Sequence, residues 1–363
     1  MAAEPTQALA VVPEPGRATP PNTVRPLADR LEGGVAPVPR RIVARHSRQD
    51  RVFLEGVRAV GLLVLVIVGS IGLFLGLQAK PTLSHYGWRF FTESRWLPSQ
   101  DIIGIRAVLV GTVEVAACAL VIAFPLAFFT ALFITDWAPA RLRAALIRAV
   151  DLMAAVPSIV FGLWVLFYIQ PHAAEIAHWL SKYFGWIPIF KVHTDVDYPI
   201  WNQSPGYAAY AGSAFIASIA VAAMVFPMAT SVMREVFGEA PAGEKEAALA
   251  LGATRWAMVR TVVIPFGRSG VIGGTMLALG RALGETISVL LIINQAFQVK
   301  VNVLESGTST ISALIATNYA EATPAQLSAL LTCGFVLFCM TLLVNTVAAQ
   351  VVKRSRSGQG TEL

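Results

Sequence analysis

Six long apolar segments limit what this chain can fold into more than any other feature of its sequence. A helix that crosses a bilayer needs about 20 mostly apolar residues, and each segment is long enough. Backbone groups in the bilayer core must be hydrogen-bonded within the protein, so such segments cross as helices. Charged residues make up only 14% of the chain, whereas soluble domains carry roughly 25%. We therefore expect an all-α polytopic membrane protein with transmembrane helices at 57–78, 107–134, 145–169, 208–233, 269–294 and 326–352.

The distribution of basic residues predicts the direction in which the chain crosses the membrane. Six spans place both termini on one side, and that side carries 20 of the 28 lysines and arginines. The opposite side carries seven, so the positive-inside rule makes the side of the termini cytoplasmic. The remaining basic residue, Arg281, falls inside the fifth segment. Because this topology accounts for the net charge of +6, no nucleic-acid partner is expected.

Two cytoplasmic tails are expected outside the transmembrane domain at 57–352. Residues 1–56 are rich in proline, alanine and arginine, and their first part has no apolar region of the kind found in signal peptides. Such a composition is typical of a disordered segment. The arginines suit contact with the headgroups of membrane lipid, although the proline content favours a plain flexible extension. Residues 353–363 form the second tail.

The cytoplasmic loop between the fourth and fifth segments, residues 234–265, has a helical pattern of its own. Pro241 can open a first helix, and Gly252 can end it in the left-handed conformation. Thr254 can cap a second helix, which we expect to stop at Pro265. Two short helices at an angle would form a surface that a soluble partner could bind.

Two charged residues of opposite sign lie within the fifth segment. Arg281 and Glu285 are spaced i,i+4 and are therefore expected to share one helix face. A charge at the centre of a span costs roughly 2.5–3.5 kcal/mol, so such residues usually face a pathway or a partner. From the residues alone, a place on a transport pathway and a structural salt bridge are equally supported. Gly280 and Gly284 form a GxxxG pair that allows another helix to approach closely.

Other polar residues carry less information. Asp151 lies one turn inside the third segment, and Pro157 predicts a kink there. The spacing of His172, Glu175 and His178 could suggest a metal site, but a solvated interfacial helix near 173–183 is the favoured interpretation, and no metal is expected. Glu114 in the second segment is assigned no role. The sequence contains no GxxxxGK[ST] motif, so this chain is not expected to bind ATP.

The cytoplasmic loop also carries a family resemblance. Glu246-Ala247-Ala248, three residues, Gly252, nine residues and then 262–265 (VVIP) resembles the EAA loop of ABC importer permeases. The resemblance implies a type I ABC importer permease fold, in which this loop is a coupling helix seated on an ATP-hydrolysing subunit. The positions implied to contact that subunit are Glu246, Ala247, Ala248, Gly252 and Ala253, with Pro265 in a structural role.

A second motif narrows the family. Residues 279–286 (LGRALGET) resemble the GRAxGET signature of phosphate-specific ABC permeases, which implies that Arg281 and Glu285 line the phosphate path. A guanidinium can give phosphate bidentate hydrogen bonds, and a nearby carboxylate would reduce the local charge so that the site can release the anion. Residues 151–162 resemble another stretch of that family, with Asp151 in place of glutamate. This favours a structural or gating role for Asp151, paired with a cytoplasmic arginine, and for Pro157, Gly280 and Gly284.

The resemblance is closest to the PstC-type permease subunit of the phosphate importer, through residues 95–98, 284–289 and 329–354. It implies a place in the bacterial plasma (inner) membrane. It also implies three protein partners: a PstA-like permease, a dimer of ATP-binding subunits and an extracytoplasmic phosphate-binding protein. ATP and Mg would be bound by the ATPase, so this chain itself holds no cofactor and is not an enzyme.

Two alternatives remain open. An ABC permease for another oxyanion, such as molybdate or sulfate, would keep the EAA loop but is disfavoured by residues 279–286. A secondary transporter or channel would need no ATPase. Secondary transporters often contain two repeated halves with matching broken helices, and no such repeat is visible in the sequence.

Overall fold

The computed structural model describes residues 48–193 and 205–356 of the chain. The chain divides into two compact units, whose boundary lies between residues 63 and 64, and each unit is described by itself. The described part of the first unit is residues 48–63, the beginning of helix α1 (Arg48–Tyr86). Residues 48–56, expected to be part of the tail, are therefore helical, and the Arg58–Glu55 pair at 2.8 Å stabilises the helix locally. The rest of that tail, residues 1–47, lies outside the described residues.

The predicted number of spans is confirmed. Among the described residues, six helices are long and apolar enough to cross a membrane. They cover Gln49–Tyr86, Arg106–Trp137, Ser158–Phe184, Ala214–Gly238, Arg255–Leu283 and Pro324–Val352. The last helix, α14 (Pro324–Arg356), continues four residues into the expected second tail, whose remainder at 357–363 is not described.

The third span begins later than the sequence predicted. Helix α4 (Ala140–Ala155) is separate from the span, which consists of α5 (Ser158–Trp164), the π-helical turn η4 (Val165–Ile169) and α6 (Gln170–Phe184). The prediction of one helix over 145–169 is wrong because Pro157 has no N–H and forces Val156 into an extended conformation with ψ of 129°. A helix is present near 173–183, as predicted, but it is α6, which belongs to the third span and is not separate from it.

The fourth and fifth spans are also shifted. A short helix α7 (Pro205–Tyr210) precedes α8 (Ala214–Gly238), and Gly212 between them has a left-handed φ of 70°. The fifth span begins with α10 (Arg255–Met258) and the π-helical turn η6 (Val259–Val263), and continues as α11 (Ile264–Leu283). The expected stop at Pro265 is wrong. Proline at the start of α11 costs little, and the π-helical turn leads the chain into the span without a break.

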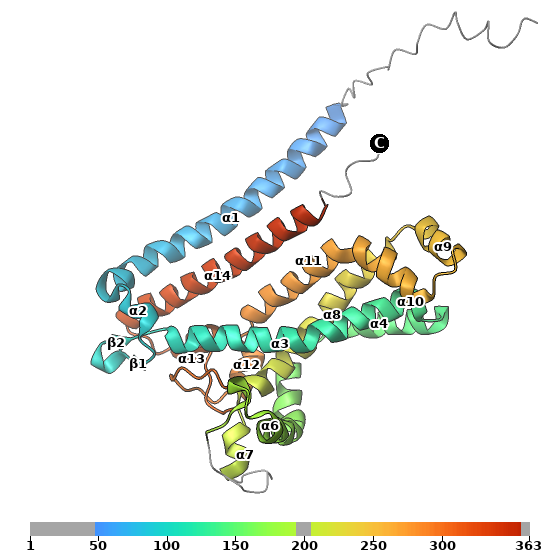
Figure 1. Ribbon diagram of the computed structural model, residues 1–363. Coiled ribbons are helices and arrows are strands. Elements are labelled where there is room, and N and C mark those ends of the chain that lie inside the picture. Colours follow the sequence, from blue (N-terminus) through green and yellow to red (C-terminus); the bar gives the residue numbers. More distant parts are fainter. Residues whose placement is uncertain (1–47, 194–204, 357–363) are drawn as a thin grey trace, which may run out of the picture. The chain divides into compact units, whose positions relative to one another are not determined.

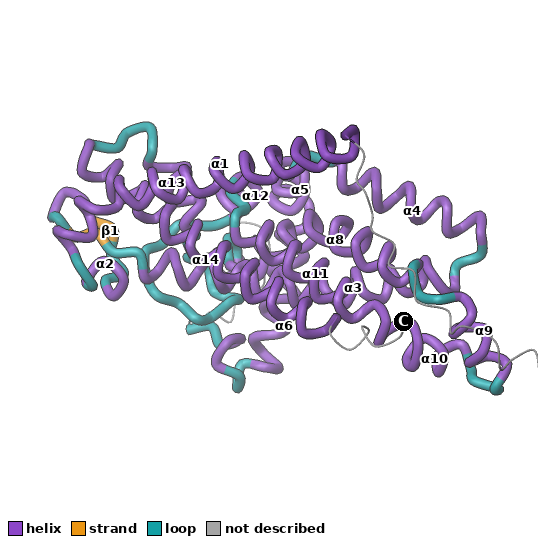
Figure 2. The backbone as a smooth tube through the Cα atoms, turned by 90° about the horizontal axis from the view of Figure 1, so that it is seen from above, coloured by secondary structure: helices purple, strands orange, loops and turns teal. Residues whose placement is uncertain are grey.

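The core of the second unit is formed by three spans that lie side by side in both Figures 1 and 2. They are α3 (Arg106–Leu132, extended by the π-helical turn η3, Phe133–Trp137), α8 and α11. Small residues allow the helices to approach closely. Every fourth residue of α3 from Ala119 to Ala131 is a buried alanine. On α11, Gly267, Gly270 and Gly274 pack directly against Phe237, Val236 and Val232 of α8.

A second, smaller core lies at the end of the unit where α3 begins (Figure 1). It contains Phe90, Trp96 and Ile105 from the entry segment, packed with residues of α13 (Ile311–Asn318) and α14. The entry segment comprises α2 (Arg89–Thr92) and the antiparallel strands β1 (Trp96–Leu97) and β2 (Ile102–Ile103). The two-helix loop of α9 (Ala242–Ala250) and α10 lies at the opposite end, where α3 and α8 finish (Figure 1).

Candidate functional site

The loop between α8 and α11 forms the predicted pair of short helices. Pro241 precedes α9, and Gly252 ends it with a left-handed φ of 85°. The Thr254 side chain then caps α10 by accepting a hydrogen bond from the Ala257 N–H at 3.2 Å. The helix starts and the glycine stop follow from capping chemistry and are confirmed.

The outer face of this loop is exposed and partly apolar. Glu246 and Ala247 are exposed, whereas Ala248 and Ala253 are half-buried against the rest of the protein. Leu251 is 90% exposed. It lies outside the membrane-spanning helices, so lipid does not cover it. Trp256, near the start of α10, is 52% exposed. Large apolar side chains exposed in this way are typical of a binding surface for another protein.

A buried ion pair attaches α9 to the end of the second span. Lys245 Nζ lies 3.2 Å from Asp136 Oδ1 in η3 and 3.5 Å from the Phe237 carbonyl oxygen at the end of α8. Their side chains are 18% and 7% exposed. Sequence reasoning missed this contact, because the two residues are far apart in the chain and no spacing rule pairs them. The ion pair holds the residue next to Glu246 in a fixed position relative to α3 and α8.

Arg281 and Glu285 are not on one helix face. Helix α11 ends at Leu283, with Arg281 in its last turn, and the chain leaves the helix at Gly284 and Glu285 before α12 (Ile287–Ile292). The expected i,i+4 pair is therefore wrong, and no ion pair joins the two residues in the described structure. Glycine at 284 weakens the helix, and the Glu285 side chain instead accepts a hydrogen bond from a backbone N–H in the first turn of α12.

Glu285 is held by the start of α12. Its Oε1 accepts a hydrogen bond from the Ser288 N–H at 3.2 Å and lies 2.9 Å from Ser288 Oγ. Ser288 is fully buried, and its Oγ also donates to the Ser158 carbonyl oxygen at 2.8 Å. Through Ser288, the interruption between α11 and α12 is hydrogen-bonded to the interruption between α4 and α5 at Pro157. Two interrupted helices in contact within a membrane domain are the kind of structure that lines substrate sites in transporters.

Arg281 itself is exposed, and its guanidinium makes no hydrogen bond or ion pair with the described residues. Its position in the last turn of α11 suits a cation, because the carbonyl end of a helix carries partial negative charge. A guanidinium fixed on a helix, with Glu285 held separately nearby in the chain, is available to an external anion.

The remaining residues that the sequence singled out lie at helix ends, at helix contacts or on the surface. Gly280 faces Asn345 of α14, where a Cβ would lie 3.3 Å from Asn345 Oδ1, whereas a Cβ at Gly284, after the end of α11, would meet only carbonyl oxygens of α11. Asp151 is exposed on α4, and the arginine pair expected for it is not formed in the described part of the chain. Pro157 forms the break between α4 and α5.

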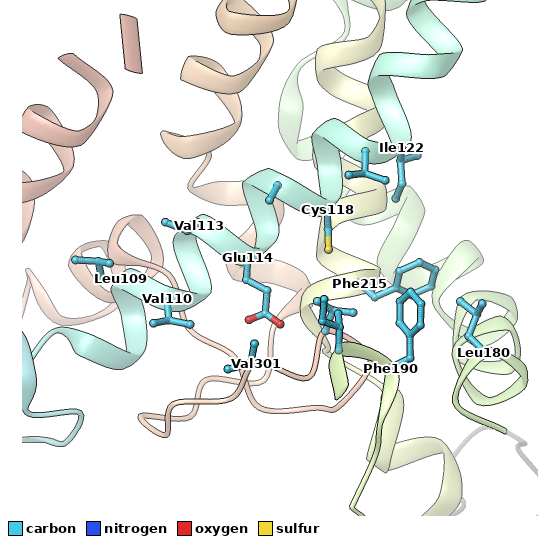
Figure 3. Close-up of a pocket in the computed structure, with 14 residues that line it drawn as sticks. Leu109, Val110, Val113, Glu114, Cys118, Ile122, Leu180, Phe190, Phe215 and Val301 are labelled. Atoms are coloured by element: carbon cyan, nitrogen blue, oxygen red, sulfur yellow. The ribbon is translucent and has the colours of Figure 1, made fainter. Parts of the chain in front are cut away.

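A hollow of about 670 Å³ lies beside α3 and contains Glu114, to which the sequence assigned no role. Its wall is otherwise apolar, with Phe190 and Phe215 on one side and Val301 on another (Figure 3). Both carboxylate oxygens of Glu114 are buried and have no hydrogen-bond partner. The cost of a charge inside a span is the signal that could have identified this residue.

Charged clusters also order the segments outside the spans. The Arg95 guanidinium and backbone N–H hydrogen-bond to Glu93 and lower the pKa of its carboxyl to about 2. In the segment before α13, burial would raise the pKa of Glu305, but hydrogen bonds from Lys300 (2.8 Å) and His193 (3.3 Å) hold it below its ordinary value.

The described residues thus contain six helices that can span a membrane, two of which meet at interrupted positions, and a protruding two-helix loop, an arrangement typical of a multi-pass helical transport permease. Residues 123–357 match the family described as "Binding-protein-dependent transport system inner membrane component", and the chain belongs to this family.

The chain is similar along most of its length to several phosphate transport permeases. The chain is 39% identical over 308 residues to phosphate transport system permease protein PstC 2 of Mycobacterium tuberculosis, a match that covers 84% of this chain and 92% of the relative. It is 39% identical over 322 residues to phosphate transport system permease protein PstC of Mycobacterium leprae, covering 87% and 98%. The corresponding protein of Pasteurella multocida is 34% identical over 316 residues.

Solved structures support the fold. The chain resembles a chain in the crystal structure of a bacterial alginate ABC transporter in complex with an alginate pentasaccharide-bound periplasmic protein, with a TM-score of 0.53 and 16% sequence identity. The match covers 83% of this chain and 96% of that chain. The expected all-α, six-span ABC importer permease fold of type I is confirmed.

Proposed function

We propose that this chain is the pore-forming, PstC-type permease subunit of an ATP-driven importer for inorganic phosphate. The observation that supports phosphate as the substrate is the similarity to relatives named as phosphate transport permeases. This similarity extends over 84–87% of the chain. The exposed guanidinium of Arg281, beside the joined breaks of α11 and α5, gives this proposal a chemical basis.

Arg281 and Glu285 have different tasks in this proposal. Phosphate sheds water as it crosses, and the Arg281 guanidinium replaces that water with bidentate, charge-assisted hydrogen bonds. Glu285 lowers the net positive charge near the site, so that the anion is bound weakly enough to leave. Because Glu285 is anchored to Ser288 and Arg281 is not, a shift of α12 against α11 would change the charge that phosphate meets.

The energy for transport comes from a partner in this proposal. The exposed surface of α9, with Glu246, Ala247 and Leu251, binds one subunit of an ATPase dimer, and that dimer holds ATP and Mg. If α9 faces an ATPase in the cytoplasm, six spans also put both termini on the cytoplasmic side of the bacterial plasma membrane. A PstA-like permease completes the pore, and an extracytoplasmic phosphate-binding protein delivers the anion at the other face.

The test is uptake by the complete transporter reconstituted in liposomes with its ATPase and binding protein. The proposal predicts ATP-dependent uptake of labelled phosphate that excess unlabelled phosphate abolishes and excess molybdate or sulfate leaves unchanged. Competition by molybdate or sulfate instead would identify a permease for another oxyanion. Uptake at full rate without ATP would identify a secondary transporter.

A further inference from the structure

Helix α14 places a side-chain amide next to the residue that precedes Arg281. Helices α11 and α14 pack against each other, and the Asn345 side chain of α14 lies against Gly280 of α11. A Cβ at position 280 would lie 3.3 Å from Asn345 Oδ1 and 3.9 Å from Nδ2. Glycine therefore leaves the space that the amide occupies, and the amide lies beside the backbone that carries Arg281.

This amide has no partner within the described part of the chain. Asn345 is exposed, and its side chain makes no hydrogen bond with the residues that the structure describes. The neighbouring hydroxyls of α14 are satisfied, since Thr341 and Thr346 donate to carbonyl oxygens of their own helix at 2.9 and 2.7 Å. Asparagine in a membrane helix usually forms a hydrogen bond to a group outside that helix. The Asn345 amide is free to do so with a group from outside this chain.

The chemistry around Asn345 indicates what that group is. Nδ2 has two N–H donors, and the guanidinium of Arg281 has five and is likewise exposed and unpaired. Glu285, four residues after Arg281, is held by Ser288 and by neither of these donors. Unpaired donors that two adjacent helices present at one place, one of them cationic, suit an oxyanion, which offers only charged acceptors to each of them.

We infer that Asn345 is a second residue that contacts phosphate on its way through the membrane, with Nδ2 donating a hydrogen bond to the anion that Arg281 binds. The inference rests on the proposed function, because it requires an anion at Arg281. It adds a contact from a different helix, so that the bound anion bridges α11 and α14. The amide supplies donors without a second positive charge, which keeps the anion from being held too tightly to leave.

The test is uptake by the complete reconstituted transporter with phosphate-loaded binding protein in excess, so that the rate reports passage and not delivery. Asn345→Leu removes both donors at similar size, and Asn345→Asp replaces them with acceptors that carry a negative charge. We expect uptake to fall about tenfold in Asn345→Leu, as for a lost hydrogen bond to a charged group, and further in Asn345→Asp. The matched control, Thr346→Val, changes the next residue, which is also exposed, and should transport normally.

A purely structural amide would give a different pattern. Recovery of the companion permease and the ATPase with the purified chain, and basal ATP hydrolysis, should match the parent in all three variants. Loss of the companion permease from Asn345→Leu, in step with the loss of uptake, would show that the amide binds that protein, and would overturn the inference. Normal uptake by Asn345→Leu, or uptake by Asn345→Asp at least equal to that of Asn345→Leu, would also overturn it.

The unmodified transporter separates this inference from the proposed function. If it imports phosphate but the variants do not follow the expected order, only the contact at Asn345 is refuted. If it imports sulfate or molybdate and the order holds for that anion, the contact stands and the phosphate assignment fails. If it imports no oxyanion, the proposed function fails and the contact fails with it.

Discussion

The ion pair between Lys245 and Asp136 makes a sharp prediction about coupling. Lys245→Met removes the ammonium group and keeps a side chain of similar length. Asp136 then remains with its side chain only 7% exposed and without its cation, and its second oxygen, Oδ2, already lacks a partner. The contact joins the coupling surface of α9 to the end of α3, so its loss should loosen α9 and leave the spans folded.

The magnitude follows from the burial of the pair. Removing one partner of a buried ion pair costs about 3–5 kcal/mol. Lys245 keeps 18% of its side chain exposed, so water can reach the site and the lower value, about 3 kcal/mol, applies. A loss of that size changes the equilibrium for docking of α9 by about 100-fold.

The assay is hydrogen exchange of the backbone amides of α9, together with the number of ATP molecules hydrolysed per phosphate imported. Lys245→Met should speed exchange in α9 and raise that number. The double variant Lys245→Met/Asp136→Leu should restore much of both, because replacing a whole buried pair by apolar residues is often neutral. Unchanged exchange in Lys245→Met, or a double variant worse than both single ones, would refute the reasoning.

Three further predictions concern packing and pH. Gly270→Val should overlap Val236 and separate α11 from α8, lowering the thermal unfolding temperature in detergent by several degrees; an unchanged temperature would contradict the close approach. Glu305→Gln should weaken the contact to Lys300 and increase hydrogen exchange at 300–306, with no change at α9. The pKa of Glu93 is lowered to about 2 in the folded protein, so its contribution to stability is present above the unfolded pKa near 4.5 and disappears as pH falls towards 2. Hydrogen exchange of the backbone amides at 90–95, corrected for intrinsic rates, should therefore rise as pH falls from 4.5 to 2. A flat profile would contradict the pairing with Arg95.

Hydropathy was sufficient to predict the number of spans but not where they are interrupted. Both breaks, at Pro157 and at Gly284, lie between apolar stretches, so a window of about 20 residues passes over them. At Pro157 the missing N–H predicts a disturbance of the helix. The sequence interpretation was a kink, whereas in the structure the helix ends there completely. At Glu285 the local choice between continuing one helix and capping the next depends on Ser288 and its contact with Ser158.

The two-helix loop was predictable because capping is local. Gly252 and Thr254 specify their backbone conformations with neighbouring atoms alone. The contact between Lys245 and Asp136 was not predictable, because it depends on how α9 packs against α3. Glu114 lies between these cases, since an acid in an apolar span signals a partner but does not identify it.

The most direct test of the central claim is phosphate uptake by the reconstituted transporter carrying Arg281→Gln. Arg268→Gln is the matched control, because Arg268 is an exposed arginine on the same helix, about 20 Å from Arg281 along its axis. A hydrogen bond to a charged group contributes about 1.5–3 kcal/mol, so uptake should fall at least about tenfold in Arg281→Gln. Assembly and basal ATP hydrolysis should be retained, and Arg268→Gln should transport normally. Normal uptake by Arg281→Gln would contradict the account, because phosphate would then cross without the one guanidinium that α11 presents beside the joined breaks.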